Sequence, residues 1–368
     1  MNGGCRAFRV TLLRPPGGPT RQGESSLSDT TRATIRDVAR LAGVSIKTVS
    51  RVVNGVPTVN AEIATRVRRA ARQLNYQPNL TASTLRRRDG RSTTIGLLVD
   101  DVANPFCASL YRAVEDIANS RRVSVAAGSV HEDPERERQL VTNFIGRQVD
   151  GLIIMSTAHD HSYLRDHQRA GTPVVFADRP PVLLAADSVL SDNRRGAERG
   201  VEHLISAGHR RVAYLGHKIN RVTAAERFRG YLDALTHARL PEDPDLVRHD
   251  LHTLELVDAA LAGMLALPDP PTALFTSQNL VTVRTIRALR ARGKQHETAL
   301  VGFDDFLLAD LLEPAVTVVA QDPGAIGTLA ANILFRRIDG DGSPPEHITL
   351  TSELVVRESG FVGPAGPR

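Results

Sequence analysis

Two short amphipathic patterns follow one another in the stretch 34–54. In the first, apolar residues recur at i, i+3 and i+4, a spacing that gives a helix one apolar face. Thr34 and Asp37 have the spacing of a capping box at its start, and Gly43 can adopt the positive φ of a turn at its end. A second pattern begins after Ser45, which can act as an N-cap. The sequence therefore predicts two short helices joined by a tight turn.

Two further helices are predicted before residue 90. The first runs from about 61 to 74, with Asn60 as its N-cap. The second, over 79–85, is too short to be stable alone in water. One interpretation is a flexible linker with a basic end. The other is a segment that folds only on DNA, with Leu85 inserted between base pairs from the minor groove.

From residue 94 onward the pattern changes to apolar runs alternating with helical stretches. The expected strands are 95–100, 123–128, 151–156, 173–178, 211–216, 272–277 and 298–304. The expected helices include 106–119, 134–147, 195–207, 224–238 and 281–292. Apolar strands between helices predict parallel sheets covered on both faces. About 270 residues exceed one such sheet, so we predict an α/β body of two doubly wound lobes.

The charge is unevenly distributed. The chain has 368 residues, 41% hydrophobic and 24% charged, with a net charge of +5, which is ordinary for a globular protein. Between residues 32 and 88, however, twelve basic residues face only Asp37 and Glu62. This segment carries +10 and leaves the rest of the chain net acidic. A basic module on an acidic body indicates a polyanionic partner.

Several features favour a cytoplasmic protein without a membrane span. The two cysteines, Cys5 and Cys107, provide no disulfide framework. No apolar run approaches the roughly 18–20 residues of a membrane span. Residues 1–31 lack the apolar stretch of a secretory signal, and we interpret them as a disordered tail or a misassigned start.

The outer face of the second predicted helix has the chemistry of a DNA-reading surface. Its side chains are short, hydroxylated or cationic, as contact with base edges and phosphates in a major groove requires. The alternative is a small helical pair with a solvated basic face. The residues concerned are Ile46, Lys47, Thr48, Ser50 and Arg51.

The run TIRDVARLAGVSIKTVSRVVN, followed by LNYQPN and Leu85, resembles the DNA-binding headpiece and hinge of the lactose/galactose repressor (LacI/GalR) family. The match extends without a gap from Thr34 to Leu85. The resemblance implies that Ile46, Lys47 and Arg51 read bases in the major groove. It assigns backbone contacts to Thr34, Ser45, Ser50, Asn54, Tyr76 and Asn79. It assigns a minor-groove hinge to Ala82, Ser83, Leu85 and Arg86.

The same resemblance implies a body like a type I periplasmic binding protein, with two lobes joined by three crossovers. We expect these near Val189–Asn193, Ala320–Pro323 and Pro344–Thr349. The implied domains are a helix-turn-helix domain at 32–78, a hinge helix and linker at 79–91, an effector-binding and dimerisation domain at 92–360, and a loose tail at 361–368.

An effector site is expected between the lobes, because ligands of open α/β sheets bind beyond the carboxyl ends of the strands. The segment 221–227 resembles the family's effector loop, and Asp304 stands where the family places a carboxylate. For each candidate, the alternative is a solvated residue or an interlobe salt bridge. The candidates are Asp101, Phe106, Cys107, Asp178, Arg179, Arg221, Thr223, Arg227, Asn279 and Asp304.

Three departures from the family pattern concern the effector. Asn279 replaces a carboxylate, Cys107 an aromatic residue, and Leu251 a stacking ring. The chain has no Trp, and its aromatic content is 4%, so stacking on a sugar would be poor. The family implies a sugar or related polar metabolite as effector. Loss of effector response is the alternative.

The sequence offers little for catalysis or metal binding. It contains no dinucleotide fingerprint after the first strand, no Walker loop and no G-x-S-x-G elbow. The pairs His159/His161 and His249/His252 lack a third ligand nearby, so we expect surface histidines. We predict no enzyme activity, no cofactor and no metal.

The predicted function is therefore a DNA-binding transcription regulator, a repressor acting as a homodimer on pseudo-palindromic double-stranded DNA. One alternative is a sugar-binding protein without a regulatory role, which would require an export signal. Another is an effector-independent regulator, and a third is an α/β enzyme fused to a DNA tether.

Overall fold

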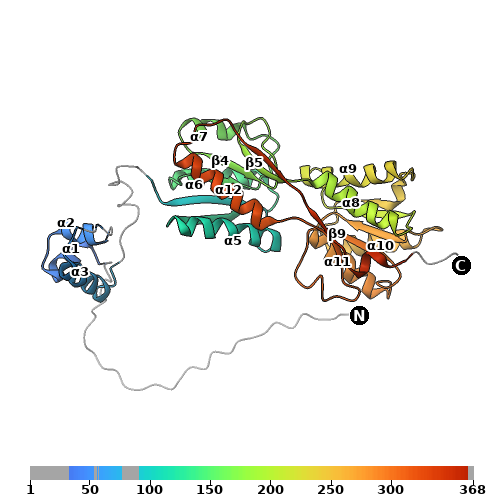
Figure 1. Ribbon diagram of the computed structural model, residues 1–368, viewed down its shortest axis with the longest axis horizontal. Coiled ribbons are helices and arrows are strands. Elements are labelled where there is room, and N and C mark those ends of the chain that lie inside the picture. Colours follow the sequence, from blue (N-terminus) through green and yellow to red (C-terminus); the bar gives the residue numbers. More distant parts are fainter. Residues whose placement is uncertain (1–32, 54–55, 57, 77–90, 364–368) are drawn as a thin grey trace, which may run out of the picture. The chain divides into compact units, whose positions relative to one another are not determined.

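The computed structural model describes residues 33–53, 56, 58–76 and 91–363 (Figure 1). The chain divides into two compact units, Met1–Ser83 and Thr84–Arg368. The first contains a small helical domain and the second the α/β body. The predicted tail, most of the hinge segment and the last residues lie outside the described ranges.

The first unit contains α1 (Ile35–Ala42), α2 (Ile46–Val53) and α3 (Ala61–Gln73). The capping box of Thr34 and Asp37 is present, and Gly43 adopts φ 61°. The hydroxyl oxygen of Ser45 accepts the Thr48 N–H at 3.1 Å, and Asn60 caps α3 through the Glu62 N–H. These three predicted helices and their caps are confirmed, whereas the helix predicted over 79–85 lies outside the described residues.

The three helices enclose a small core. Val38 and Val49 are fully buried and Val67 is 1% exposed, and alanines fill the spaces between them. Tyr76 is half-buried against this cluster. The apolar faces are therefore used in packing, and the remaining faces of the helices are free to carry polar and charged side chains.

The first lobe of the body is a six-stranded sheet in the order β11-β5-β4-β3-β1-β2, and all its strand pairs are parallel. Its strands are β1 (Thr94–Val99), β2 (Ser124–Ser129), β3 (Leu152–Ile154), β4 (Val174–Ala177), β5 (Asp187–Ser191) and β11 (His347–Leu350). Its helices are α5 (Pro105–Ser120), α6 (Pro134–Gly146), α7 (Arg165–Arg169) and α12 (Pro323–Ile338).

The second lobe repeats this plan in the order β12-β10-β9-β8-β6-β7. Its strands are β6 (Val212–Leu215), β7 (Val247–Arg248), β8 (Ala273–Thr276), β9 (Ala299–Phe303), β10 (Thr317–Ala320) and β12 (Glu353–Val355). Its helices are α8 (Asn193–Ser206), α9 (Val222–His237), α10 (Leu254–Leu265) and α11 (Asn279–Ala291). Edge strand β12 pairs with β10 in the antiparallel sense, so this sheet is not wholly parallel.

Both faces of each sheet are covered, as predicted. In β1, Ile95 and Leu97 pack on one core with α5 and α12, whereas Leu98 packs on another with α6. In the second lobe, α8 and α9 cover one face and α10 and α11 the other. The side chains of successive residues of a strand point to opposite faces, so a continuous apolar strand supplies both cores.

The chain passes between the lobes at three places. Those after β5 and after β10 fall in the predicted ranges. The third prediction, at residues 344–349, was wrong, because His347–Leu350 is strand β11 paired with β5 in the first lobe. The crossing follows at Thr351 and Ser352. Polar and apolar residues alternate in β11, an edge strand, so it lacks the continuous apolar run by which the other strands were found.

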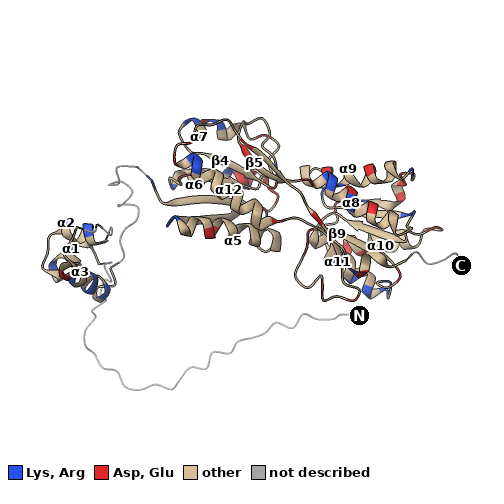
Figure 2. Cartoon of the chain, in the orientation of Figure 1, with Lys and Arg blue, Asp and Glu red and all other residues tan. Residues whose placement is uncertain are grey.

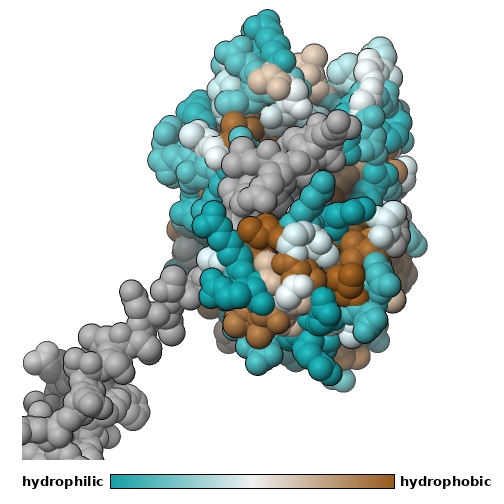
Figure 3. All heavy atoms as spheres, turned by 90° about the vertical axis from the view of Figure 1, so that its left-hand side faces the viewer, coloured by the Kyte–Doolittle hydropathy of each residue, from teal (hydrophilic) through white to brown (hydrophobic). Residues whose placement is uncertain are grey.

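None of the helices in the described ranges is long and apolar enough to cross a membrane. In the face shown in Figure 3, hydrophobic spheres lie in patches among many hydrophilic ones. A folded domain normally keeps a large share of apolar atoms at its surface.

Candidate functional sites

The outward side of α2 presents the side chains expected to contact DNA. Ile46 is 43% exposed, and Lys47 and Arg51 are also exposed, whereas Thr48 and Ser50 are half-buried. Ile46 is a large apolar residue that lies at the surface beside two cations, so it does not serve the headpiece core. Contact with a thymine methyl group would bury it.

Several of the predicted DNA contacts also have structural roles. The Thr34 hydroxyl donates to Asp37 at 2.6 Å, and the hydroxyls of Ser45 and Thr48 lie 2.9 Å apart. Arg51 donates from Nη2 to the Thr58 hydroxyl at 2.5 Å. Asn54, Asn79, Ala82, Ser83, Leu85 and Arg86 lie outside the described residues.

Helix α3 carries four of the eight basic residues in the described part of the headpiece (Figure 2). Its arginines Arg66, Arg68, Arg69 and Arg72 are exposed. Asp37, one of the few acidic residues of the described headpiece, lies 3.1 Å from Arg40, which partly neutralises the charge of its carboxylate. The headpiece therefore keeps an excess of cations that can neutralise phosphates.

The body contains a polar cavity of about 50 Å³ at the carboxyl ends of strands from both lobes. The first lobe contributes Asp100, Asn104, Phe106, Cys107, Glu132, Met155, Asp178 and Arg179. The second contributes His217, Arg221, Thr223, Ala224, Arg227, Ser277, Gln278, Asp304 and Gln321. The cavity lies beyond the carboxyl ends of the strands, where the sequence analysis expected a ligand site.

Two of the predicted effector residues do not line this cavity. The Asp101 carboxylate accepts the Ala103 N–H at 2.9 Å in the turn before α5, and Asp100 faces the cavity instead. Asn279 is 1% exposed, and its amide donates to the side-chain oxygen of Asn104 in the other lobe at 3.0 Å. Asn279 thus connects the lobes.

Asp100 directly follows β1 and begins the strand-end segment 100–107 that was expected at the ligand site. The lining also includes residues that the sequence analysis did not identify. Glu132 lies three residues after the end of β2, so applying the strand-end rule to every strand would have found it. Gln321 follows β10, a strand that was not predicted. His217 and Gln278 directly follow the predicted strands 211–216 and 272–277, so the same rule would have found them.

Asp178 and Asp304 occupy equivalent positions in the two lobes. Each follows a central strand, adopts a left-handed φ of 65° or 67°, and donates its N–H at 2.9 Å to a neighbouring strand, at Val189 or Val319. Asp tolerates this conformation better than most residues. The turn directs one carboxylate from each lobe toward the cavity.

Arg227 organises the half of the site that belongs to the second lobe. Its Nη1 lies 3.2 Å from Asp304 Oδ2, its Nε donates to Asn193 Oδ1 at 2.7 Å, and its guanidinium lies 3.8 Å from the Phe303 ring centroid. Gln321 donates to Asp304 Oδ1 at 2.5 Å. Arg227 and Asp304 are therefore held in place by each other and by neighbouring groups of the second lobe.

Arg179 has the corresponding role in the first lobe. It donates to Asp100 Oδ2 and to the Ser156 carbonyl, both at 2.9 Å. Although burial raises the pKa of Asp100, Arg179 and Arg221 hold it below its usual value. Burial raises the pKa of Asp178 to about 6, because its favourable interactions with Arg179 and Arg227 compensate only in part.

Five buried side-chain atoms around the cavity have no hydrogen-bond partner within the described structure. They are the acceptors Asp178 Oδ1, Gln278 Oε1 and Gln321 Oε1 and the donors Arg179 Nε and Arg221 Nε. Buried polar atoms are normally satisfied. Hydroxyl groups both donate and accept, so a polyhydroxylated ligand can satisfy both kinds, whereas a carboxylate or phosphate serves only the donors.

The expectation that His161 lies at the surface was wrong. His161 is 1% exposed and forms a buried network with Ser156 and Glu137. The Val182 N–H donates to His161 Nδ1 at 2.7 Å, so Nε2 carries the proton and donates to Ser156. Because that nitrogen is protonated, His161 cannot accept a proton from the Ser156 hydroxyl, and the pair does not form a nucleophile and base.

Comparison with known proteins shows similarity over most of the chain. The model for bacterial regulatory proteins of the lacI family matches residues 34–79, and a periplasmic binding protein-like domain matches residues 201–360. Catabolite control protein A of Priestia megaterium is 30% identical over 329 residues, which cover 89% of this chain and 98% of that protein. The ribose operon repressor of Haemophilus influenzae is 31% identical with the same coverage.

Solved structures agree in fold. The complex of the transcriptional regulator CelR with cellobiose aligns with a TM-score of 0.65 and 31% identity, covering 89% of this chain and all of that one. The lac repressor dimer bound to operator and the anti-inducer ONPF aligns with a TM-score of 0.78 and 26% identity, covering 90% of this chain and 100% of that chain.

Proposed function

Because this chain belongs to the LacI family of bacterial regulatory proteins, we propose that it is a sequence-specific repressor of transcription, acting on DNA in the cytoplasm. Its affinity for the operator responds to a small molecule bound between the lobes of the body. We assign the DNA-binding domain to residues 32–78, the hinge and linker to 79–91, and the effector-binding and dimerisation domain to 92–360.

The observation that supports DNA binding most directly is the outward side of α2. We assign base reading to Ile46, Lys47 and Arg51, with the exposed Ile46 and the two cations directed away from the headpiece core. The capped N-terminus of α2 and the arginines of α3 supply groups that can hold phosphates.

The unpartnered atoms of the cavity support a polyhydroxylated effector. Asp178 and Asp304 would accept hydrogen bonds from hydroxyl groups, and Arg179, Arg221 and Arg227 would donate to ring or hydroxyl oxygens. One related structure contains a sugar, the CelR complex with cellobiose. We therefore propose a sugar or a similar polyol, and no part in catalysis for this site.

An exposed leucine cluster supports a homodimer. Leu307, Leu308 and Leu311 are 82%, 53% and 72% exposed on the segment after β9. Side chains of this size close together at a surface favour association. A second copy would bury them, and a dimer would present two headpieces to a pseudo-palindromic site, as its two-fold symmetry requires.

The proposal is tested by selecting sequences from a random duplex library with the purified full-length protein at moderate salt. We expect enrichment of a pseudo-palindrome whose binding survives scrambled competitor DNA. A thermal-shift screen of sugars and polyols then identifies compounds whose addition changes operator affinity. Equal binding of selected and scrambled duplexes, with and without these compounds, would refute the proposal.

A further inference from the structure

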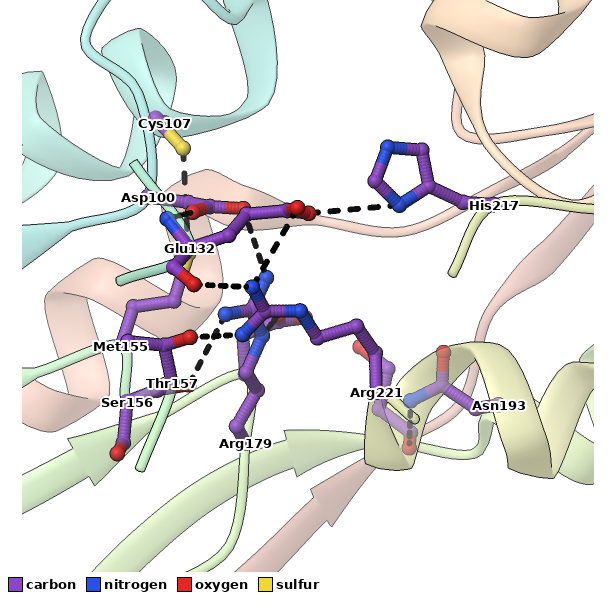
Figure 4. A network of polar contacts seen from close by, with 12 residues as sticks. Asp100, Cys107, Glu132, Met155, Ser156, Thr157, Arg179, Asn193, His217 and Arg221 are labelled. Carbon is purple, nitrogen blue, oxygen red and sulfur yellow. Dashed lines mark hydrogen bonds and ion pairs between the residues drawn. The ribbon is translucent and has the colours of Figure 1, made fainter. Parts of the chain in front are cut away.

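The cleft is crossed by a cluster of charges centred on Glu132. This residue follows β2 of the first lobe, whereas His217, Lys218 and Arg221 follow β6 of the second. Glu132 Oε2 lies 2.8 Å from Lys218 Nζ and 3.4 Å from Arg221 Nη2, and Oε1 lies 3.4 Å from His217 Nδ1. Figure 4 shows His217 and Arg221 pointing toward Glu132 from their own segments.

The side chain of Arg221 reaches fully across to the first lobe. Its Nη2 donates to the backbone carbonyl of Glu132 at 2.9 Å, and its Nη1 donates to the Thr157 hydroxyl. The residue is 8% exposed. A residue of the second lobe is thus buried among groups of the first, although it belongs to the segment proposed to hold the effector.

This arrangement leaves little room for a ligand. The cavity measures about 50 Å³, whereas pockets for small molecules are on the order of 300–1,000 Å³. Arg179 and Arg221 both line this cavity. At this cavity the lobes therefore meet through side chains of the protein.

The cluster is suited to hold a charged carboxylate. Burial raises the pKa of Glu132, but the hydrogen bond from Lys218 and the charges of His217 and Arg221 outweigh it and hold the pKa below its usual value. The Glu132 and Arg221 side chains are 17% and 9% exposed, so solvent screens their attraction less than that of a surface pair. The bond between Asn279 and Asn104 joins the lobes at a second point.

We propose that Glu132 is an internal latch that holds the two lobes together across the cleft by binding the basic segment 217–221 of the opposite lobe. An effector then has to displace Arg221 from Glu132, so Glu132 sets how readily the site opens. The part of this inference that concerns the effector rests on the proposed function. The contact between the lobes does not, because residues of this chain alone form it.

The test is hydrogen exchange of the full-length protein, without ligand or DNA, followed by mass spectrometry of peptides that cover 215–224 and 153–158. Glu132→Gln keeps the shape of the side chain and removes its charge. We expect exchange in both peptides to rise about tenfold, since local opening controls it, together with a larger radius of gyration in X-ray scattering. Glu135→Gln is the matched control, because Glu135 is exposed and its ion pair, with Arg138, lies within its own helix.

A second variant tests the pairing itself. Lys218→Gln removes a partner that is 38% exposed, so it preserves the fold even if Glu132→Gln does not. We expect it to raise exchange in the same peptides, and the double variant to add little to Glu132→Gln. If both single variants match Glu135→Gln in exchange and in radius of gyration, the latch is refuted, whatever the protein's behaviour toward DNA.

Discussion

The carboxyl group of Asp178 should make the stability of the body depend on pH between about 4 and 6. Burial raises the pKa of Asp178 in the folded protein from 3.8 to about 6. A group whose pKa is raised on folding stabilises the protein fully below its unfolded pKa, and this contribution is lost as the pH rises through the folded pKa. Substitution by Asn, which does not ionise, removes the dependence.

The magnitude follows from the difference between the two pKa values. One pKa unit corresponds to 1.36 kcal/mol, so the difference of about two units corresponds to about 3 kcal/mol. We expect the free energy of unfolding of the wild type, relative to Asp178→Asn, to fall by up to this amount from pH 4 to pH 6 and to be constant above about pH 7.

The measurement is a series of urea unfolding curves for the wild type and Asp178→Asn between pH 4 and 8. Other titrating groups are common to both proteins, so they cancel in the difference. Asp166→Asn, at the 91% exposed carboxylate of α7, is the control and should give a small and flat difference. A flat difference for Asp178→Asn as well would show that burial of its carboxylate is not costly and would refute the reasoning.

Three further predictions concern other parts of the molecule. Arg51→Ala should relax base preference at one operator position, with a loss of about 1–3 kcal/mol at that position; an unchanged preference in a binding-site selection would count against base reading by Arg51. Leu311→Ser should weaken the dimer at least about tenfold in sedimentation equilibrium, and an unaltered dissociation constant would place the interface elsewhere. Gly230→Ala should lower the free energy of unfolding by about 1–3 kcal/mol, because a Cβ there would overlap the backbone carbonyl of Arg194 where α8 and α9 pack. Unfolding curves that coincide with those of the wild type would show that the two helices can move apart at no cost in free energy.

The headpiece was predictable almost to the residue because its signals are local. The interactions of Thr34 with Asp37 and of Asn60 with Glu62 lie within one helical turn, so the printed sequence contains both partners side by side. Capping residues therefore defined where the helices begin.

Strand β5 was missed for the opposite reason. It begins with Asp187, a residue unfavourable in strands, which is 5% exposed and pairs with Arg337 of α12 at 2.7 Å. This partner is 150 residues away in sequence. A tertiary ion pair thus allows a polar residue where a local pattern predicts none.

In the candidate site, too, some residues could be predicted from local pattern and others depend on long-range contacts. The strand-end rule identified Asp178 and Asp304 because each directly follows an apolar strand. It could not show that Arg221 would form an ion pair with Glu132, or that Asn279 would bind Asn104, because these pairs form only when the two lobes meet. Local pattern located the cleft, and long-range pairing decided how its residues are used.

The late crossovers affect how the chain can be divided and made. The first lobe needs α12 and β11, and the second needs β12, all of which follow residue 322. A fragment that ends at residue 320 therefore lacks an edge strand in each sheet and the helix that buries Ile95 and Leu97. During synthesis on the ribosome, neither half can complete its core until nearly the whole polypeptide has emerged, so the two halves should mature together.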